Sequence, residues 1–118
     1  MAGLRTRARG YALQVLYALD VNAEEGSSDA VPLYREHFDV ELEEQGQAFA
    51  TRLVEAVQKN REAIDEQLQK ASKNWRVERM STVDRNILRL ACAELCYHDE
   101  VPTKVVINEA IELAKRFG

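Results

Sequence analysis

Apolar residues recur at helical spacing along most of this chain, and no other feature constrains the fold as strongly. Residues three and four apart lie on one face of an α-helix, so a repeat of this kind marks a buried stripe. No stretch alternates apolar and polar residues as a half-buried strand would, and only two prolines and five glycines interrupt the pattern. The sequence therefore predicts an all-α fold of about five or six packed helices.

Turn and capping residues divide this pattern into segments. We expect helices over residues 4–20 and 28–38, and over residues 49–71 either one long helix or two with a seam near Asn60. A further helix begins at Ser81, whose position three residues before Asp84 is close to a capping box. The last helix follows a turn at residues 99–103 and ends near Phe117. A length of 118 residues fits one domain, so residues 1–118 are predicted to form a single-domain helical bundle.

The first expected helix has two distinct arcs. Its apolar stripe is formed by small and branched side chains: Ala8, Ala12, Val15 and Leu19. The opposite arc carries Thr6, Arg7, Gly10, Gln14 and Tyr17. The pattern predicts that this stripe packs against the rest of the bundle.

Composition excludes several classes of protein. No run approaches the roughly 20 apolar residues of a membrane span, and no apolar stretch follows the N-terminal arginines as in a signal peptide. Two cysteines do not make a disulfide scaffold. We therefore expect a cytoplasmic protein that has no contact with a membrane.

The net charge of −4 is unevenly distributed. Residues 1–19 hold three arginines and no acid, whereas residues 20–44 hold nine acids and a single base, Arg35. Salt screens charges beyond about 8 Å, so the local field governs anion binding more than the total charge does. A basic N-terminus can therefore meet phosphate on an acidic protein, and the acidic segment is interpreted as a solvated face.

The chain offers little for catalysis. Cys92 and Cys96 are four residues apart, which suits either a metal or redox pair or, as we favour, two small core residues. Glu94 and His98 are also four apart, as an acid/base pair or a surface helix pair would be. The five glycines are scattered and form no phosphate loop. These observations favour a binding protein over an enzyme, with no metal and no cofactor.

Arg5, Arg7 and Arg9 form a collar around the start of the first expected helix. Their guanidinium groups can each bind a phosphate through two hydrogen bonds, although a solvated helix start would carry the same residues. Downstream polar and aromatic residues could stack on bases or hydrogen-bond to them: Tyr11, Gln14 and Tyr17. Contact with nucleic acid is therefore one expectation from the residues alone.

Three segments resemble the NusB family of bacterial transcription antitermination factors. Residues 5–17 (RTRARGYALQVLY) are similar to its arginine-rich opening. Residues 78–80 (ERM), 83–91 (VDRNILRLA) and the pair Glu94-Leu95 form the second segment. Residues 101–118 (VPTKVVINEAIELAKRFG) are the most specific, and the similarity is weaker through residues 53–65.

The resemblance implies an all-helical RNA-binding protein without enzymatic activity. Family members pair with NusE, a small-subunit ribosomal protein, and bind boxA RNA in ribosomal RNA leaders, helping to assemble an antitermination complex on RNA polymerase. Residue by residue, Arg5, Arg7 and Arg9 match the arginine-rich motif that meets RNA, and Gln14 lies on the same helix. The family positions that face NusE correspond to Tyr17, Glu78 and Asp84 in this sequence.

The chain also departs from the family pattern. Gly10 stands where an acid is common, and Thr6 interrupts the arginine run. The sequence stops at Gly118 where the family usually continues into one further helix, so we expect a NusB-type bundle that lacks this helix. An open apolar groove would favour self-association, and a homodimer is one hypothesis.

Two other functions remain as alternatives. One is an accessory domain related to the NusB-like domain of ribosomal RNA methyltransferases, although the chain contains no methyltransferase glycine loop. The other is a helical scaffold that binds protein only. In a protein-only scaffold, replacing Arg7 and Arg9 by alanine would leave RNA affinity unchanged.

Overall fold

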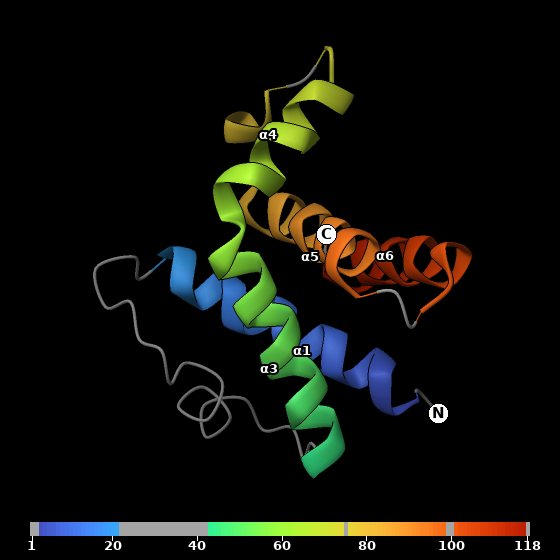
Figure 1. The fold of residues 1–118 in the computed structure, drawn as a ribbon. Coiled ribbons are helices and arrows are strands. Elements are labelled where there is room, and N and C mark those ends of the chain that lie inside the picture. Colours follow the sequence, from blue (N-terminus) through green and yellow to red (C-terminus); the bar gives the residue numbers. More distant parts are fainter. Residues whose placement is uncertain (1–2, 22–42, 75, 99–100, 118) are drawn as a thin grey trace.

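Five α-helices and one short 3₁₀-helix build the described part of the chain, residues 3–21, 43–74, 76–98 and 101–117 of a computed structural model (Figure 1). Its elements are α1 (Leu4–Val21), α3 (Glu44–Lys59), α4 (Arg61–Ala71), the 3₁₀-helix η2 (Val77–Arg79), α5 (Thr82–Tyr97) and α6 (Thr103–Phe117). The all-α expectation is confirmed. The helix expected over residues 28–38 lies outside the described residues. Within the described ranges, no helix is long and apolar enough to cross a membrane.

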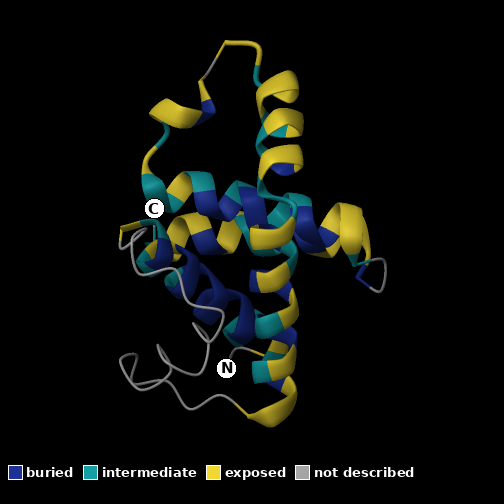
Figure 2. Ribbon diagram, turned by 60° about the vertical axis from the view of Figure 1, so that its left-hand side comes forward, coloured by how far each residue is buried: buried dark blue, intermediate teal, exposed yellow. Residues whose placement is uncertain are grey.

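Helix α1 is largely buried in the bundle. It contacts α3 and α5, and it crosses beneath α3 in Figure 1, while Figure 2 shows most of its length as buried. The predicted apolar stripe of α1 is buried, and burial extends beyond it, because Tyr11, Leu13 and Leu16 are each at most 2% exposed. Helices that contact α1 from more than one side also cover residues outside the stripe.

Asn60 divides the long helical segment into two helices, as the seam hypothesis predicts. Its backbone N–H donates to the carbonyl of Ala56 at 3.1 Å and thus ends α3. Its own carbonyl accepts from the N–H of Ile64 at 2.8 Å and thus begins α4. The side-chain amide also donates to Ala56 at 2.9 Å, so one asparagine satisfies backbone groups at the junction.

Ser81 caps α5, as its position before Asp84 predicts. The Ser81 hydroxyl accepts a hydrogen bond from the Asp84 backbone N–H at 3.1 Å, which satisfies a donor that has no partner inside the helix. From this cap α5 runs antiparallel to α6, and the two helices lie side by side (Figure 1). Side chains from α1, α3, α4, α5 and α6 share one hydrophobic core.

A buried polar cluster ties the end of α1 to α4 and α5. Arg89 makes two 2.8 Å hydrogen bonds to Asp65 of α4 and one of 3.1 Å to Asp20 of α1. Asn86 also donates to Asp20, at 2.9 Å. Burial alone would lower the pKa of Arg89, but the hydrogen bonds and charges of Asp65 and Asp20 outweigh it and raise the pKa. The guanidinium therefore stays charged, and its charge is neutralised inside the fold.

Replacement of Gly10 by alanine tests the packing of α1 against α6. Gly10 is buried inside α1, and a Cβ atom there would meet Phe117 and Arg116 at 3.8 Å, which is ordinary van der Waals contact. Alanine has the better helix propensity, so Gly10→Ala should raise the free energy of unfolding by about 1 kcal/mol. Urea denaturation measures this change. As a control, Gly3→Ala should not stabilise, because Gly3 precedes the helix and alanine is a poor cap. A less stable Gly10→Ala would contradict the packing.

Candidate nucleic-acid interface

The first turn of α1 presents two accessible arginines. Arg5 is exposed, with its guanidinium carbon 5.2 Å from the centroid of the Phe49 ring, and no ion pair engages Arg5 within the described part of the chain. The Arg7 side chain is 36% exposed and donates to Glu43 at 3.2 Å. Its Nε atom is buried and donates to nothing among the described residues. Each guanidinium group has five N–H donors and these contacts use few of them, so both side chains retain donors for an anion.

Arg9 does not join them at the surface. The side chain is 3% exposed, and it makes a bidentate ion pair with Glu94 of α5. Nε donates to one carboxylate oxygen at 2.6 Å and Nη2 donates to the other at 2.9 Å. The expected collar of three surface guanidinium groups is therefore corrected to two, because α5 supplies an acid that draws the third inward.

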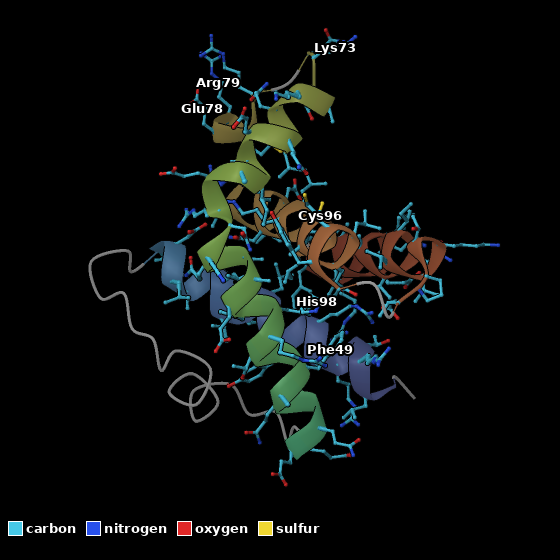
Figure 3. All side chains as sticks on the ribbon, in the orientation of Figure 1. Phe49, Lys73, Glu78, Arg79, Cys96 and His98 are labelled. Atoms are coloured by element: carbon cyan, nitrogen blue, oxygen red, sulfur yellow. The ribbon has the colours of Figure 1, made fainter. Side chains whose placement is uncertain are left out.

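The ring of Phe49 in α3 lies among three guanidinium groups. The sequence pattern did not indicate this role. Three guanidinium carbons surround its ring, at 5.2 Å for Arg5, 5.2 Å for Arg9 and 5.8 Å for Arg52. At such distances the ring face attracts a cation. Figure 3 shows Phe49 on the part of α3 that crosses α1. Its helical spacing indicated only a core position, and Phe49 is indeed 4% exposed.

Gln14 and Tyr17 lie further along α1, beside a mainly apolar groove of about 430 Å³. Gln14 is half-buried and donates to the Gly10 carbonyl at 3.3 Å, while Tyr17 is 44% exposed. Val83 of α5 and Phe117 of α6 line the same groove. Tyr11, considered for base stacking, is only 1% exposed and cannot present its ring to RNA in this structure.

Glu78 and Asp84 are both exposed, near the start of α5. Glu78 pairs with Arg76 at 3.2 Å, and its carbonyl accepts from Arg85 at 3.2 Å. Figure 3 shows Glu78 beside Arg79, at the end of the molecule where α4 terminates. Asp84 lines a second groove, of about 900 Å³, formed between η2, α5 and α6. Val83, which precedes Asp84 in the sequence, lines the same groove as Tyr17. Tyr17 and Asp84 therefore lie near each other at the start of α5.

The residues considered for catalysis do not form a catalytic site. Glu94 is 2% exposed and its carboxylate is held by Arg9, so it forms neither a surface pair nor an accessible base with His98. The interpretation of both cysteines as core residues is wrong for Cys96, which is exposed, while Cys92 is half-buried. Their sulfur atoms are 3.9 Å apart. Among the described residues, no group of three or more His, Cys, Asp or Glu side chains could hold a metal ion.

These features define a small all-helical binding protein, with an arginine-bearing helix start and a separate exposed face that combines acidic and apolar groups. The chain belongs to the NusB family, whose sequence pattern it matches over residues 6–118. The resemblance seen in the sequence is thereby confirmed, and with it the expectation of a non-enzymatic transcription antitermination protein.

Curated relatives and solved structures agree with this assignment. The chain is 50% identical to transcription antitermination protein NusB of Anaeromyxobacter dehalogenans strain 2CP-1, covering 100% of this chain and 81% of the relative. It is 48% identical to NusB of Trichlorobacter lovleyi, covering 98% and 80%.

Two crystal structures share the fold. A structure of NusB from T. maritima superposes with a TM-score of 0.86 at 31% identity, covering 100% of this chain and 81% of that one. A structure of antitermination factors NusB and NusE in complex with double-stranded RNA superposes with a TM-score of 0.85 at 26% identity, covering 100% and 86%. The expected bundle of the NusB type, shorter than its relatives, is confirmed.

The reactivity of Cys92 provides a test of the α4–α5 packing. Burial, assisted by the neighbouring Cys96 thiol, raises the pKa of Cys92 to about 11. At pH 8 only about one Cys92 in a thousand is then a thiolate, so alkylation should be slow and should accelerate about tenfold per pH unit up to pH 11. Mass spectrometry of iodoacetamide-treated protein measures this rate at the single residue. Alkylation at pH 8 as fast as that of an unstructured cysteine peptide would show that the packing is incorrect.

Proposed function

We propose that this protein binds boxA-type single-stranded RNA together with NusE, and thereby helps to assemble an antitermination complex on RNA polymerase. Membership of the NusB family supports this proposal, as does the likeness to a structure containing NusB, NusE and RNA. The observation that carries the RNA contact is the pair of accessible arginines, Arg5 and Arg7, at the start of α1. In this role the protein would act in the cytoplasm, where transcripts are made.

The chemistry of Arg5 and Arg7 suits a flexible strand. Residues two apart on a helix point about 200° apart, so the two guanidinium groups diverge around the helix start. Each presents a planar set of donors that can bind a phosphate through two hydrogen bonds. The first backbone N–H groups of α1 add positive potential at the same end. Gln14, further along the helix, is proposed as an additional polar contact with the RNA.

The second proposed surface binds NusE through Tyr17, Glu78 and Asp84. Two carboxylates complement a basic ribosomal protein and would accelerate its association. The exposed Tyr17 ring beside an apolar groove offers the partner a contact that combines an aromatic face with a hydroxyl group. This combination of charged and apolar groups favours a protein partner over a second stretch of RNA.

Alanine substitution at both Arg5 and Arg7 tests the RNA surface. The double variant should bind a boxA-like RNA more weakly, on the scale of about 1.5–3 kcal/mol for each lost charged hydrogen bond. Each lost phosphate contact should also reduce the slope of log K against log salt by about 0.7 for a single strand. Fluorescence titration at several salt concentrations, with boxA-like and scrambled RNA and with or without NusE, measures both quantities.

Lysines at the far end of the molecule provide the matched control. Lys70→Ala with Lys73→Ala removes the same charge from the exposed end of α4, where Figure 3 shows Lys73. This control should leave RNA affinity and the salt slope close to those of the unsubstituted protein. If the arginine variant behaves like the lysine variant, α1 does not carry the RNA site. The helical scaffold that binds protein only would then be the better description.

Charge reversal at Asp84 tests the partner surface. Asp84→Lys should weaken binding of isolated NusE while the protein remains folded, because it introduces a cation into a face that meets a basic protein. Glu62→Lys is the control, since Glu62 occupies the first turn of α4 and incurs the same helix-dipole penalty. Calorimetric titration measures both affinities. An unchanged Asp84→Lys affinity would count against this surface.

Self-association remains a separate prediction. The groove of about 900 Å³ beside α5 and α6, lined by apolar and polar side chains, offers a surface for a homodimer at high concentration. Light scattering across a range of concentrations decides between the two states. A mass equal to one chain throughout would reject the homodimer.

A further inference from the structure

Arg9, one of the three arginines at the start of α1, is buried where RNA does not reach it. Arg9 is 3% exposed and its partner Glu94 is 2% exposed, so neither side chain reaches the surface. The two groups meet in a bidentate arrangement, with N–O distances of 2.6 and 2.9 Å. Such pairing fixes the plane of the guanidinium as well as its position.

The ion pair belongs to a larger cluster that involves α6. Glu109 of α6 lies 3.7 Å from Nη1 of Arg9, and it accepts a 2.7 Å hydrogen bond from the hydroxyl of Thr6. Thr6, which interrupts the arginine run, therefore supports the same cluster from the preceding turn of α1. The first turns of α1 are thus fastened to α5 through Glu94 and to α6 through Glu109.

Phe49 connects this cluster to the accessible Arg5, because its ring contacts both Arg9 and Arg5. Arg5 and Arg9 are four residues apart on α1, and both guanidinium carbons lie 5.2 Å from the centroid of the Phe49 ring. Arg9 therefore lies against the same ring as Arg5, and that ring is itself buried in the core. Arg7, between them in sequence, is carried by the same helical turn.

Withdrawal of Arg9 toward a phosphate would be unfavourable. All three of its nitrogen atoms face carboxylates: Nε and Nη2 face Glu94, and Nη1 faces Glu109. Moving the guanidinium outward would leave Glu94 as a buried charge with no counter-charge, which costs more than one phosphate contact returns. The structure therefore disfavours Arg9 as a direct contact.

We propose that Arg9 is a positioning residue, which with Glu94 holds the start of α1 so that Arg5 and Arg7 meet the RNA phosphates. This inference rests on the proposed RNA-binding function and refines it. A strand that binds to a prearranged helix start does not have to order that start on binding, and prearrangement of this kind increases affinity.

Neutralising Glu94 separates positioning from direct contact, because the two roles predict opposite signs. Glu94→Gln removes a negative charge and would release Arg9, so a direct phosphate contact predicts tighter RNA binding. Positioning predicts binding weaker by roughly tenfold, the cost of ordering a side chain or two, with the salt slope unchanged because Arg5 and Arg7 still make their contacts. Titration with a boxA-like RNA at several salt concentrations measures both, and circular dichroism verifies the fold. Affinity that is equal or higher would overturn the proposal.

Glu112→Gln is the matched control for this substitution. Glu112 lies on α6, is 60% exposed and pairs only loosely with Lys115 at 3.6 Å. Removing its charge should leave RNA affinity unchanged or slightly higher. A tenfold loss in the control would assign the effect of Glu94→Gln to something other than the buried pair.

Arginine-specific labelling tests the proposal in the unsubstituted protein, where folding is not in question. Phenylglyoxal should modify Arg5 and Arg7 in the RNA-free protein, and a boxA-like RNA should protect both, while Arg9 stays unmodified throughout. Modification of Arg9 without RNA and its protection by RNA would overturn the positioning role. Absence of protection at Arg5 and Arg7 would instead reject the proposed RNA site, so the two failures are distinguishable.

Discussion

The buried ion pair between Arg9 and Glu94 is the constraint on which the placement of α1 depends. An arginine inside the bundle must keep a counter-charge, since removal of one partner from a buried pair typically costs about 3–5 kcal/mol. The bidentate geometry leaves α1 little freedom to rotate or slide against α5. At the other end of α1, Asp20 forms an ion pair with Arg89, which also belongs to α5. Ion pairs to α5 therefore hold α1 near both of its ends.

This arrangement explains how one largely buried helix can carry two binding surfaces. Most of α1 serves as core, and only its first turn and one side of its second half remain accessible. The first turn carries Arg5 and Arg7, and the second half carries Tyr17 beside the start of α5. In the proposed function, RNA and NusE therefore meet a single rigid element. The aromatic ring of Phe49 has two structural roles: it packs in the core, and its face attracts the neighbouring guanidinium groups.

Local interactions were readily predicted. The break at Asn60 and the cap at Ser81 depend on hydrogen bonds between residues at most four apart, and such spacing is visible in the sequence. The helical periodicity of α3, α5 and α6 likewise follows from residues three and four apart. The contacts of Thr6 and Gly10, by contrast, depend on the distant helix α6: Thr6 donates to Glu109, and Phe117 lies beside Gly10.

The sequence by itself determined the helical class, most helix boundaries in the described residues and the arginine-rich segment that marks the family. Only the tertiary structure decided which arginines remain at the surface. Arg9 and Glu94 are 85 residues apart in sequence, so no local pattern shows that they meet. The same holds for Tyr11, which neighbouring helices cover, and for Cys96, which they leave exposed. Burial depends on which distant helices pack together, and a charged side chain turns inward only where the fold supplies its counter-charge.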